Sequence, residues 1–168
     1  MDKICIEFTN GKKINLELYR NHAPETVENF LSLVKDGFYD GLCFHRVIEN
    51  FMIQGGGFKW EGGLVPKNAP KTIKGEFKAN GVKNELKHTP GVISMARTMF
   101  PNSASSQFFI CVETVPHLDG QYAAFGKTTD KESLEVAMEI SKVDTGYIGG
   151  YDDVPMAPIV IKTISVIE

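Results

Sequence analysis

Two short runs at the start of the chain alternate between apolar and more polar residues. They cover positions 4–8 and 14–18. Alternation with a period of two predicts β-strands with one buried face. Asn10 and Gly11 lie between the runs, and Asn-Gly is the strongest short hairpin signal because both central positions of the favoured turn need positive φ. The chain is therefore predicted to open with a β-hairpin.

A helical period follows the hairpin. Apolar residues recur at i, i+3, i+4 and i+7, which places them on one face of a helix. The residues of this stripe are Val27, Phe30, Leu31 and Val34. Pro24 fits the first helical position, where its missing N–H costs nothing, and Gly37 fits a left-handed stop. We expect this helix to cover an open end of a β-structure.

The rest of the chain reads as short strands separated by loops. The strands are expected within 43–54, 91–95, 107–112, 123–126 and 159–167. The stretches 55–84 and 147–153 are rich in glycine and are expected to be irregular loops. A second helix is expected to follow Thr129, which with Glu132 has the spacing of a capping box.

Many short strands with only two helices indicate an all-β fold, either a barrel or a sandwich, with helices as caps. We find no linker of disordered composition and no internal repeat. With 168 residues, the chain is expected to form one domain, 1–168, with a sizeable core.

Composition narrows the class of protein. A hydrophobic fraction of 42% and a charged fraction of 23% are ordinary for a soluble globular protein. A net charge of −3 gives no reason to expect nucleic acid or a membrane surface as partner. Cys5, Cys43 and Cys111 each lie in an apolar run, so we expect reduced, buried thiols. No signal peptide precedes the first strand, and we expect a cytoplasmic monomer.

The stretch from Phe44 to Gly57 gives the first indication of chemistry. Arg46 lies there with large apolar residues close on both sides, and the stretch ends in Gln54 and a run of glycines. A strand with one buried face should alternate instead. Either the arginine extends to solvent along its stem, or its guanidinium is held at the rim of an apolar pocket.

Five blocks of the sequence, in order, resemble those of the cyclophilins, which are peptidyl-prolyl cis-trans isomerases. The blocks are Phe44-His45-Arg46, Phe51-Met52-Ile53-Gln54-Gly55-Gly56, Ser94-Met95-Ala96-Arg97, Ser106-Gln107-Phe108-Phe109-Ile110 and Leu118-Asp119-Gly120. They span nearly the whole chain. The form Ala96-Arg97-Thr98 resembles the bacterial-type branch.

The resemblance implies a closed eight-stranded antiparallel β-barrel with a helix over each end. It implies that the protein accelerates rotation about Xaa-Pro bonds without a covalent step or a cofactor, and that Arg46 is the catalytic residue. The substrate-binding residues that it implies are His45, Phe51, Met52, Gln54, Ala96, Arg97, Thr98, Gln107, Phe109, His117, Leu118 and Tyr122. Phe44 and Phe108 are expected in the barrel core instead. The partners implied are proline-containing peptides and unfolded or flexible protein segments.

Other chemistries have little support in the sequence. The glycines from Gly55 to Gly63 do not fit the dinucleotide pattern, since Trp60 occupies its last glycine position and no helix pattern follows. The histidines are scattered and no cysteine pair has zinc-ligand spacing, so no metal site is expected. The serines lack the context of a hydrolase nucleophile.

The chain departs from the family pattern at three positions. His117 stands where cyclosporin-sensitive members usually carry tryptophan, so we expect weak cyclosporin binding. Tyr122 stands where many have histidine, and Gly57 replaces the usual aspartate at a position that we interpret as structural. Two alternatives stay open: a proline-segment binding module or chaperone of the same fold without catalysis, and a ligand-carrying barrel, which the many bulky inward residues disfavour.

Overall fold

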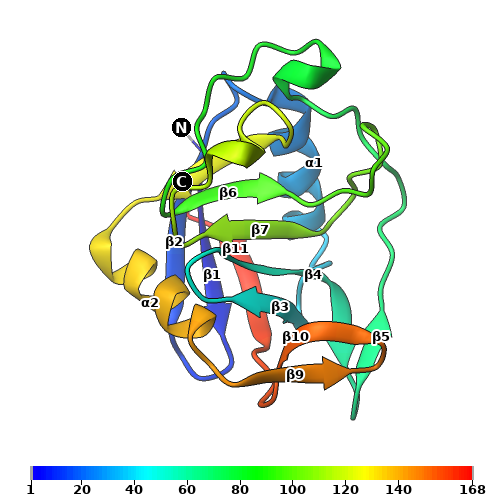
Figure 1. Cartoon of the computed structure of the whole chain (residues 1–168), viewed down its shortest axis with the longest axis vertical. Helices are drawn as coiled ribbons and strands as arrows, with labels where there is room; N and C mark the ends of the chain where they lie inside the picture. Colours follow the sequence, from blue (N-terminus) through cyan, green and yellow to red (C-terminus); the bar gives the residue numbers. More distant parts are fainter. Residues whose placement is uncertain (1, 168) are drawn as a thin grey trace.

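The computed structural model describes residues 2–167 and is dominated by one antiparallel sheet that curves into a barrel (Figure 1). In the order of their hydrogen-bonded neighbours, its strands are β11 (Ile161–Val166), β1 (Asp2–Phe8), β2 (Lys13–Leu18), β8 (Ala124–Thr128), β6 (Val92–Met95), β7 (Phe108–Cys111), β4 (Met52–Trp60) and β3 (Leu42–Ile48). The short strand β5 (Leu64–Pro66) pairs with β4 outside this path.

The two ends of the sheet, β3 and the segment leading into β11, meet along a short seam. The Phe44 amide donates to the Ile159 carbonyl at 2.9 Å, and the Gly41 amide donates to the Ile161 carbonyl at 2.8 Å. These bonds nearly close the eight-stranded barrel that was predicted. A closed sheet leaves no long edge exposed to further pairing.

Bulky side chains fill the barrel. Phe30 of α1 (Pro24–Lys35) contacts the rings of Tyr39, Phe108 and Phe125 at centroid distances of 5.2–5.6 Å. Phe108 also meets Phe44 at 5.8 Å, and both are buried in the main core, as predicted. The interior of this barrel is therefore a packed core, which argues against the ligand-carrying alternative.

Helix α1 begins and ends as the sequence predicts, but its first turn is capped from a distance. Pro24 is the first helical residue and Gly37 follows the helix with φ of 69°. The residue before the helix gives no side-chain cap. Instead the buried Glu76 carboxylate accepts from the Thr26 amide at 2.6 Å and the Thr26 hydroxyl at 2.7 Å. A negative charge at a helix N-terminus is stabilising, so this contact fixes the long loop against the barrel.

Two local predictions differ from the structure in detail. Helix α2 (Lys131–Ser141) is capped by Asp130, whose carboxylate accepts from the Ser133 amide at 2.7 Å, so the predicted capping box at Thr129 is wrong. The first hairpin forms as predicted, but Gly11 alone takes positive φ in its turn, while the Asn10 side chain accepts from the Lys12 amide. Short polar side chains compete for backbone donors in this way.

The two predicted glycine-rich loops contain strands. Strand β4 runs through the glycines to Trp60. Glycine is needed there because a Cβ at Gly55 would lie only 3.0 Å from the Cys43 carbonyl of the neighbouring strand. The second stretch forms a hairpin of β9 (Thr145–Ile148) and β10 (Tyr151–Pro155), separate from the barrel sheet. Single turns of 3-10 helix cover Lys78–Asn80 and Pro116–Leu118.

The cysteines are free and buried, as predicted. Burial raises the pKa of the Cys43 thiol to about 11 and that of Cys111 to about 12, so both stay protonated and unreactive near neutral pH. No helix among residues 2–167 is long and apolar enough to cross a membrane.

Candidate functional site

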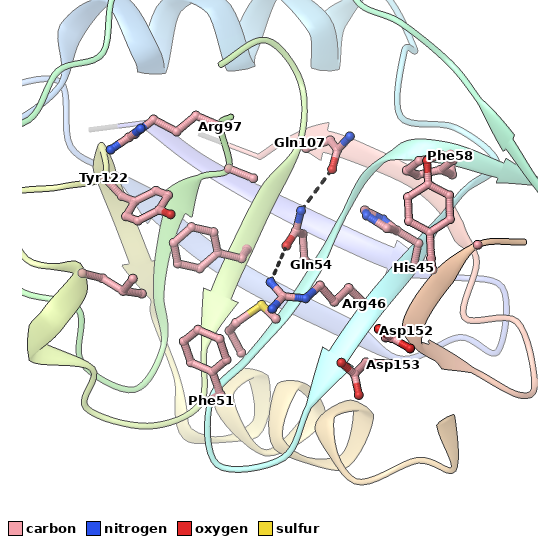
Figure 2. Close-up of a pocket in the computed structure, with 16 residues that line it drawn as sticks. His45, Arg46, Phe51, Gln54, Phe58, Arg97, Gln107, Tyr122, Asp152 and Asp153 are labelled. Carbon is pink, nitrogen blue, oxygen red and sulfur yellow. Dashed lines mark hydrogen bonds between the residues drawn. The ribbon is translucent and has the colours of Figure 1, made fainter. Parts of the chain in front are cut away.

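The predicted site residues meet in one open pocket of about 540 Å³ on the outside of the barrel (Figure 2). Those that line it are His45, Arg46, Phe51, Met52, Gln54, Ala96, Arg97, Gln107, Phe109, Leu118 and Tyr122. Thr98 lines a smaller adjoining pocket instead. His117 is exposed and does not line the pocket, although its ring lies 6.1 Å from that of Phe51.

One part of the pocket is an apolar socket. Phe109, Met52 and Leu118 belong to a buried cluster that is distinct from the main core, and Phe51 and Tyr122 pack against it. The Tyr122 ring meets that of Phe109 edge-on at 5.7 Å. Phe108 and Phe109 lie on opposite faces of β7, because successive strand residues alternate sides. The socket suits a small apolar ring.

A chain of polar side chains runs along the side of this socket. Arg46 on β3 is paired with Gln54 on β4, and Gln54 is in turn paired with Phe109 on β7. Arg46 Nη1 donates to Gln54 Oε1 at 3.4 Å, and Gln54 Nε2 donates to Gln107 Oε1 at 3.0 Å. The first bond is long for an N–H···O bond and therefore weak. The glutamines orient the guanidinium without neutralising it.

Arg46 carries a positive charge that no acidic side chain of the described chain neutralises. Its side chain is exposed, and its Cζ lies 6.0 Å from the centre of the Phe51 ring. Among the described residues, no carboxylate lies within ion-pair distance of it. The sequence left two placements open for this arginine, and the structure has its guanidinium at the pocket rim.

Arg97, by contrast, is engaged by the protein itself. Its Nε and Nη2 donate to the Gln121 carbonyl at 3.0 and 2.7 Å, and its Nη1 donates to the Thr98 carbonyl at 2.9 Å. Its Cζ lies 4.8 Å from the centre of the Tyr122 ring. Arg97 therefore joins two segments of the pocket wall, 97–98 and 121–122.

His45 is buried in the wall of the pocket, with its ring 4.5 Å from that of Phe58. Burial, helped by the charge of Arg46, lowers its pKa to about 4. Its ring is therefore neutral at physiological pH. The Nδ1 atom is fully enclosed and has no hydrogen-bond partner among the described residues.

A Ser-His-Asp array lies behind the socket, and no motif in the sequence indicates it. His88 Nε2 lies 2.9 Å from Ser94 Oγ, and His88 Nδ1 lies 3.0 Å from Asp119 Oδ1. Ser94 and His88 are 0% and 1% exposed, so no substrate can reach the serine. The His88 ring stacks on Phe109 at 6.0 Å and 17°. The array supports the socket and is not a hydrolytic site.

The remaining lining residues were not predicted. They are Phe58, Gly150, Tyr151, Asp152 and Asp153, and all but Phe58 belong to the β9–β10 hairpin and its turn (Figure 2). The only signal in this stretch is the Gly149-Gly150 pair, which marks a turn but not the pocket. Nowhere in residues 2–167 do three metal-ligating side chains gather closely enough to hold a metal ion.

Comparison with known proteins identifies relatives along the whole chain. Residues 4–166 match the family model described as cyclophilin type peptidyl-prolyl cis-trans isomerase/CLD. The chain is 44% identical to peptidyl-prolyl cis-trans isomerase A of Dickeya dadantii over 165 residues, which cover 95% of this chain and 82% of the relative. It is 40% identical to peptidyl-prolyl cis-trans isomerase B of Escherichia coli over 168 residues, which cover 95% and 97%.

Solved structures resemble the whole fold. A cyclophilin type peptidyl-prolyl cis-trans isomerase of Cryptosporidium parvum, crystallised in the presence of the dipeptide Ala-Pro, superposes with a TM-score of 0.76 at 29% identity, covering 99% of both chains. A second crystal structure of that protein gives a TM-score of 0.77 at 28% identity, covering 99% of this chain and 98% of the other.

Proposed function

Since this chain belongs to the cyclophilin-type peptidyl-prolyl cis-trans isomerases, we propose how its own pocket residues carry out that reaction. The activity is rotation about Xaa-Pro peptide bonds, and the partners are proline-containing peptide segments. The proposal concerns the role of each residue in that rotation.

The reaction sets a modest requirement. Rotation about a peptide bond has a barrier of ~18–20 kcal/mol, because conjugation must be broken. An enzyme that turns over at ~1–1000 s⁻¹ faces a barrier of roughly 13–17 kcal/mol. The pocket must therefore lower the barrier by only about 3–7 kcal/mol, and no bond has to be made or cleaved.

Arg46 provides a large share of this lowering of the barrier. When the bond is twisted, the prolyl nitrogen loses conjugation and its lone pair becomes basic. A guanidinium that donates to it forms a charge-assisted hydrogen bond worth roughly 1.5–3 kcal/mol. Because this bond exists mainly in the twisted state, it lowers the barrier rather than the energy of the bound substrate. Arg46 has no carboxylate partner among the residues that the structure describes, which leaves its donors available for this role.

The socket holds the proline ring. Burying the ring against Phe51, Met52, Phe109 and Leu118 removes water from the prolyl amide, which strengthens the interaction with Arg46. The main chain at Ala96, with the flanking 97–98, holds the residue before proline. One side of the bond is then fixed while the other turns.

The finer assignments follow from the same arrangement. We propose that the protein acts as a monomer on unfolded or flexible segments, whose extended backbone can enter the open pocket. Its free, buried thiols support a cytoplasmic location. We propose weak cyclosporin binding, because the exposed residue beside Phe51 is His117 and not an indole.

One observation carries the assignment of roles. The Arg46 guanidinium lies at the rim of an apolar socket, and no carboxylate of the described residues pairs with it. The test is a protease-coupled assay on an Ala-Pro peptide with the purified chain. Acceleration of the cis-to-trans phase that rises linearly with enzyme supports catalysis. Peptide binding without acceleration would instead support the non-catalytic binding module, which has no need of the arginine.

A further inference from the structure

The pocket continues past Arg46 onto a surface that proline isomerisation does not use. This surface, here named the hairpin subsite, consists of Phe58 on β4 and of Tyr151, Asp152 and Asp153 on β10, with His45 at its base. Figure 2 shows it on the side of Arg46 away from Arg97 and Tyr122.

The two aspartates have no partner in the protein. Neither carboxylate has a hydrogen bond or an ion pair with another described residue. The β10 ladder is irregular between Tyr151 and Val154, and Asp153 takes φ of 60°, which is rare for a residue other than glycine. Bulges of this kind redirect side chains. In Figure 2 both aspartates extend from the hairpin toward Arg46.

Aromatic rings form the wall beside the carboxylates. The Tyr151 ring meets that of Phe58 edge-on at 5.1 Å and that of His45 at 6.4 Å. Tyr151 is 44% exposed, so part of its ring faces solvent next to the two carboxylates. Exposed aromatic faces attract cations, most strongly where water is partly excluded.

His45, at the base of the subsite, is an independent observation because its buried ring has no hydrogen-bond partner among the described residues. It is only 5% exposed, yet neither ring nitrogen has a hydrogen bond to the described residues. Buried polar groups are normally satisfied, and an unsatisfied one needs an explanation. In Figure 2 its ring lies at the pocket wall with the nitrogen atoms directed inward. A neutral imidazole offers one acceptor nitrogen.

These groups have one ligand class in common. Two carboxylates, an acceptor imidazole and aromatic faces all favour a cation with N–H donors. A metal ion does not fit, because no three described metal-ligating side chains lie close enough together. An anion would meet two like charges. The ammonium of lysine or the guanidinium of arginine fits all of them.

We propose that the hairpin subsite binds the basic side chain of a residue that follows proline in the client segment. This rests on the proposed function, in which the residue before proline lies at Ala96–Thr98. The chain leaving the socket in the other direction then passes Arg46 and reaches the hairpin. Arg46 repels a nearby cation, so the basic group contacts the outer carboxylates and leaves the guanidinium to the prolyl nitrogen.

The experiment compares capped peptides by NMR exchange spectroscopy, which needs no protease. One set is Ac-Ala-Ala-Pro-Zaa-Ala-NH₂ with Zaa lysine, glutamine or glutamate, and a second set has Zaa two residues before proline. In the first set kcat/KM should be about tenfold higher for lysine than for glutamate, as expected for partly exposed charge pairs. In the second set the ratio should be near one. In 1 M NaCl the first ratio should fall toward one, because the Debye length is then about 3 Å.

The variant Asp152→Asn/Asp153→Asn should reduce the lysine-to-glutamate ratio about fivefold or more. Glu61→Gln/Asp144→Asn is the matched control, since it removes two exposed carboxylates that do not line the pocket. That control should keep the parent ratio. The rate on the glutamine peptide is measured for each protein as well. This rate does not depend on a charge at Zaa, so it shows whether the pocket is intact.

Equal rates on the lysine and glutamate peptides in the parent protein would overturn the proposal. So would a ratio that survives in Asp152→Asn/Asp153→Asn, or one that is lost equally in the control. Failure of the proposed function looks different, because the uncharged glutamine peptide would then not be accelerated either. If the double variant does not fold, the salt dependence and the two peptide sets still decide the question in the parent protein.

Discussion

Gly57 leaves the space that the side chain of Gln107 occupies. A Cβ at Gly57 would lie 2.5 Å from Gln107 Nε2 and 2.6 Å from both its Cδ and its Cγ. No side chain fits there unless the whole glutamine moves. Gln107 accepts from Gln54, and Gln54 accepts from Arg46, so Gly57 sits at the far end of the polar chain that orients the guanidinium.

We predict that Gly57→Ala lowers kcat/KM on an Ala-Pro peptide by about three- to tenfold, which corresponds to a misplaced hydrogen-bond partner rather than a lost catalytic group. Gly63→Ala is the matched control, because a Cβ there meets nothing within 4 Å. Isomerase assays on both variants measure the difference.

The same assay tests whether the effect passes through Gln107. In a Gln107→Ala background, Gly57→Ala should change kcat/KM by less than about twofold, since coupled residues are not additive. Independent, additive effects of the two substitutions would mean that Gly57 acts in another way.

Phe108 and Phe109 are predicted to separate stability from activity. Phe108 is in the main core, where its ring meets those of Phe30, Tyr39 and Phe44. Its truncation should cost ~3–5 kcal/mol in the free energy of unfolding. Phe109→Ala should lower that free energy less and lower kcat/KM more, because it removes the floor of the socket. Urea melts and isomerase rates on both variants decide; the reverse order would mean that the faces are misassigned.

His45 is predicted to make stability depend on pH. Burial lowers its folded-state pKa to about 4, below the usual histidine value of 6.5. Between these values the unfolded chain binds the proton and the folded chain does not, so the free energy of unfolding falls as the pH falls. The loss should reach about 3 kcal/mol near pH 4. His88, whose pKa is also lowered by burial, adds to the loss in the same direction.

The variant His45→Gln isolates this contribution. Its free energy of unfolding, measured in urea from pH 7 to pH 4, should fall by about 3 kcal/mol less than that of the parent. The change in the free energy of unfolding between pH 7 and pH 4 is compared, and not its absolute value. This comparison removes any effect of the substitution on stability at neutral pH. Parallel curves for the two proteins would contradict a buried, neutral His45.

The sequence correctly predicts those elements in which the hydrophobic pattern marks the face that is buried. The stripe from Val27 to Val34 and the alternation in 4–8 each commit one face to the core, and that face is buried in the structure. The strand expected within 43–54 is also present, as β3 and the start of β4, although the pairing of Arg46 with Gln54 across them was not predicted. These features need few long-range contacts.

What the sequence did not predict depends on tertiary contacts. The glycines of β4 look like loop residues, and only the close neighbouring strand explains them as strand. Asp152 and Asp153 carry no periodic signal, and they reach the pocket only because their hairpin packs against β3. The Ser94-His88-Asp119 array joins residues from separate segments in the same way.

His117 is predicted to limit cyclosporin binding. An indole at this position has more apolar area than an imidazole by some tens of Å², which at roughly 25 cal/mol per Å² contributes about 1–2 kcal/mol. His117→Trp should therefore tighten inhibition by about tenfold, with a much smaller effect on turnover of a short peptide. Titration of both proteins with the drug in the isomerase assay measures this. Nanomolar inhibition of the parent, or no gain from tryptophan, would remove His117 from the explanation.

The most direct test of the central claim is kcat/KM of Arg46→Ala on an Ala-Pro peptide, with Arg46→Lys alongside. Both should fold as the parent does, since Arg46 is exposed and its guanidinium makes only one weak hydrogen bond to the described residues. We predict that Arg46→Ala raises the barrier by about 2–4 kcal/mol, and that lysine does not restore the rate, because a point charge lacks the planar fork of donors. A folded Arg46→Ala protein that isomerises the peptide as fast as the parent would contradict the mechanism.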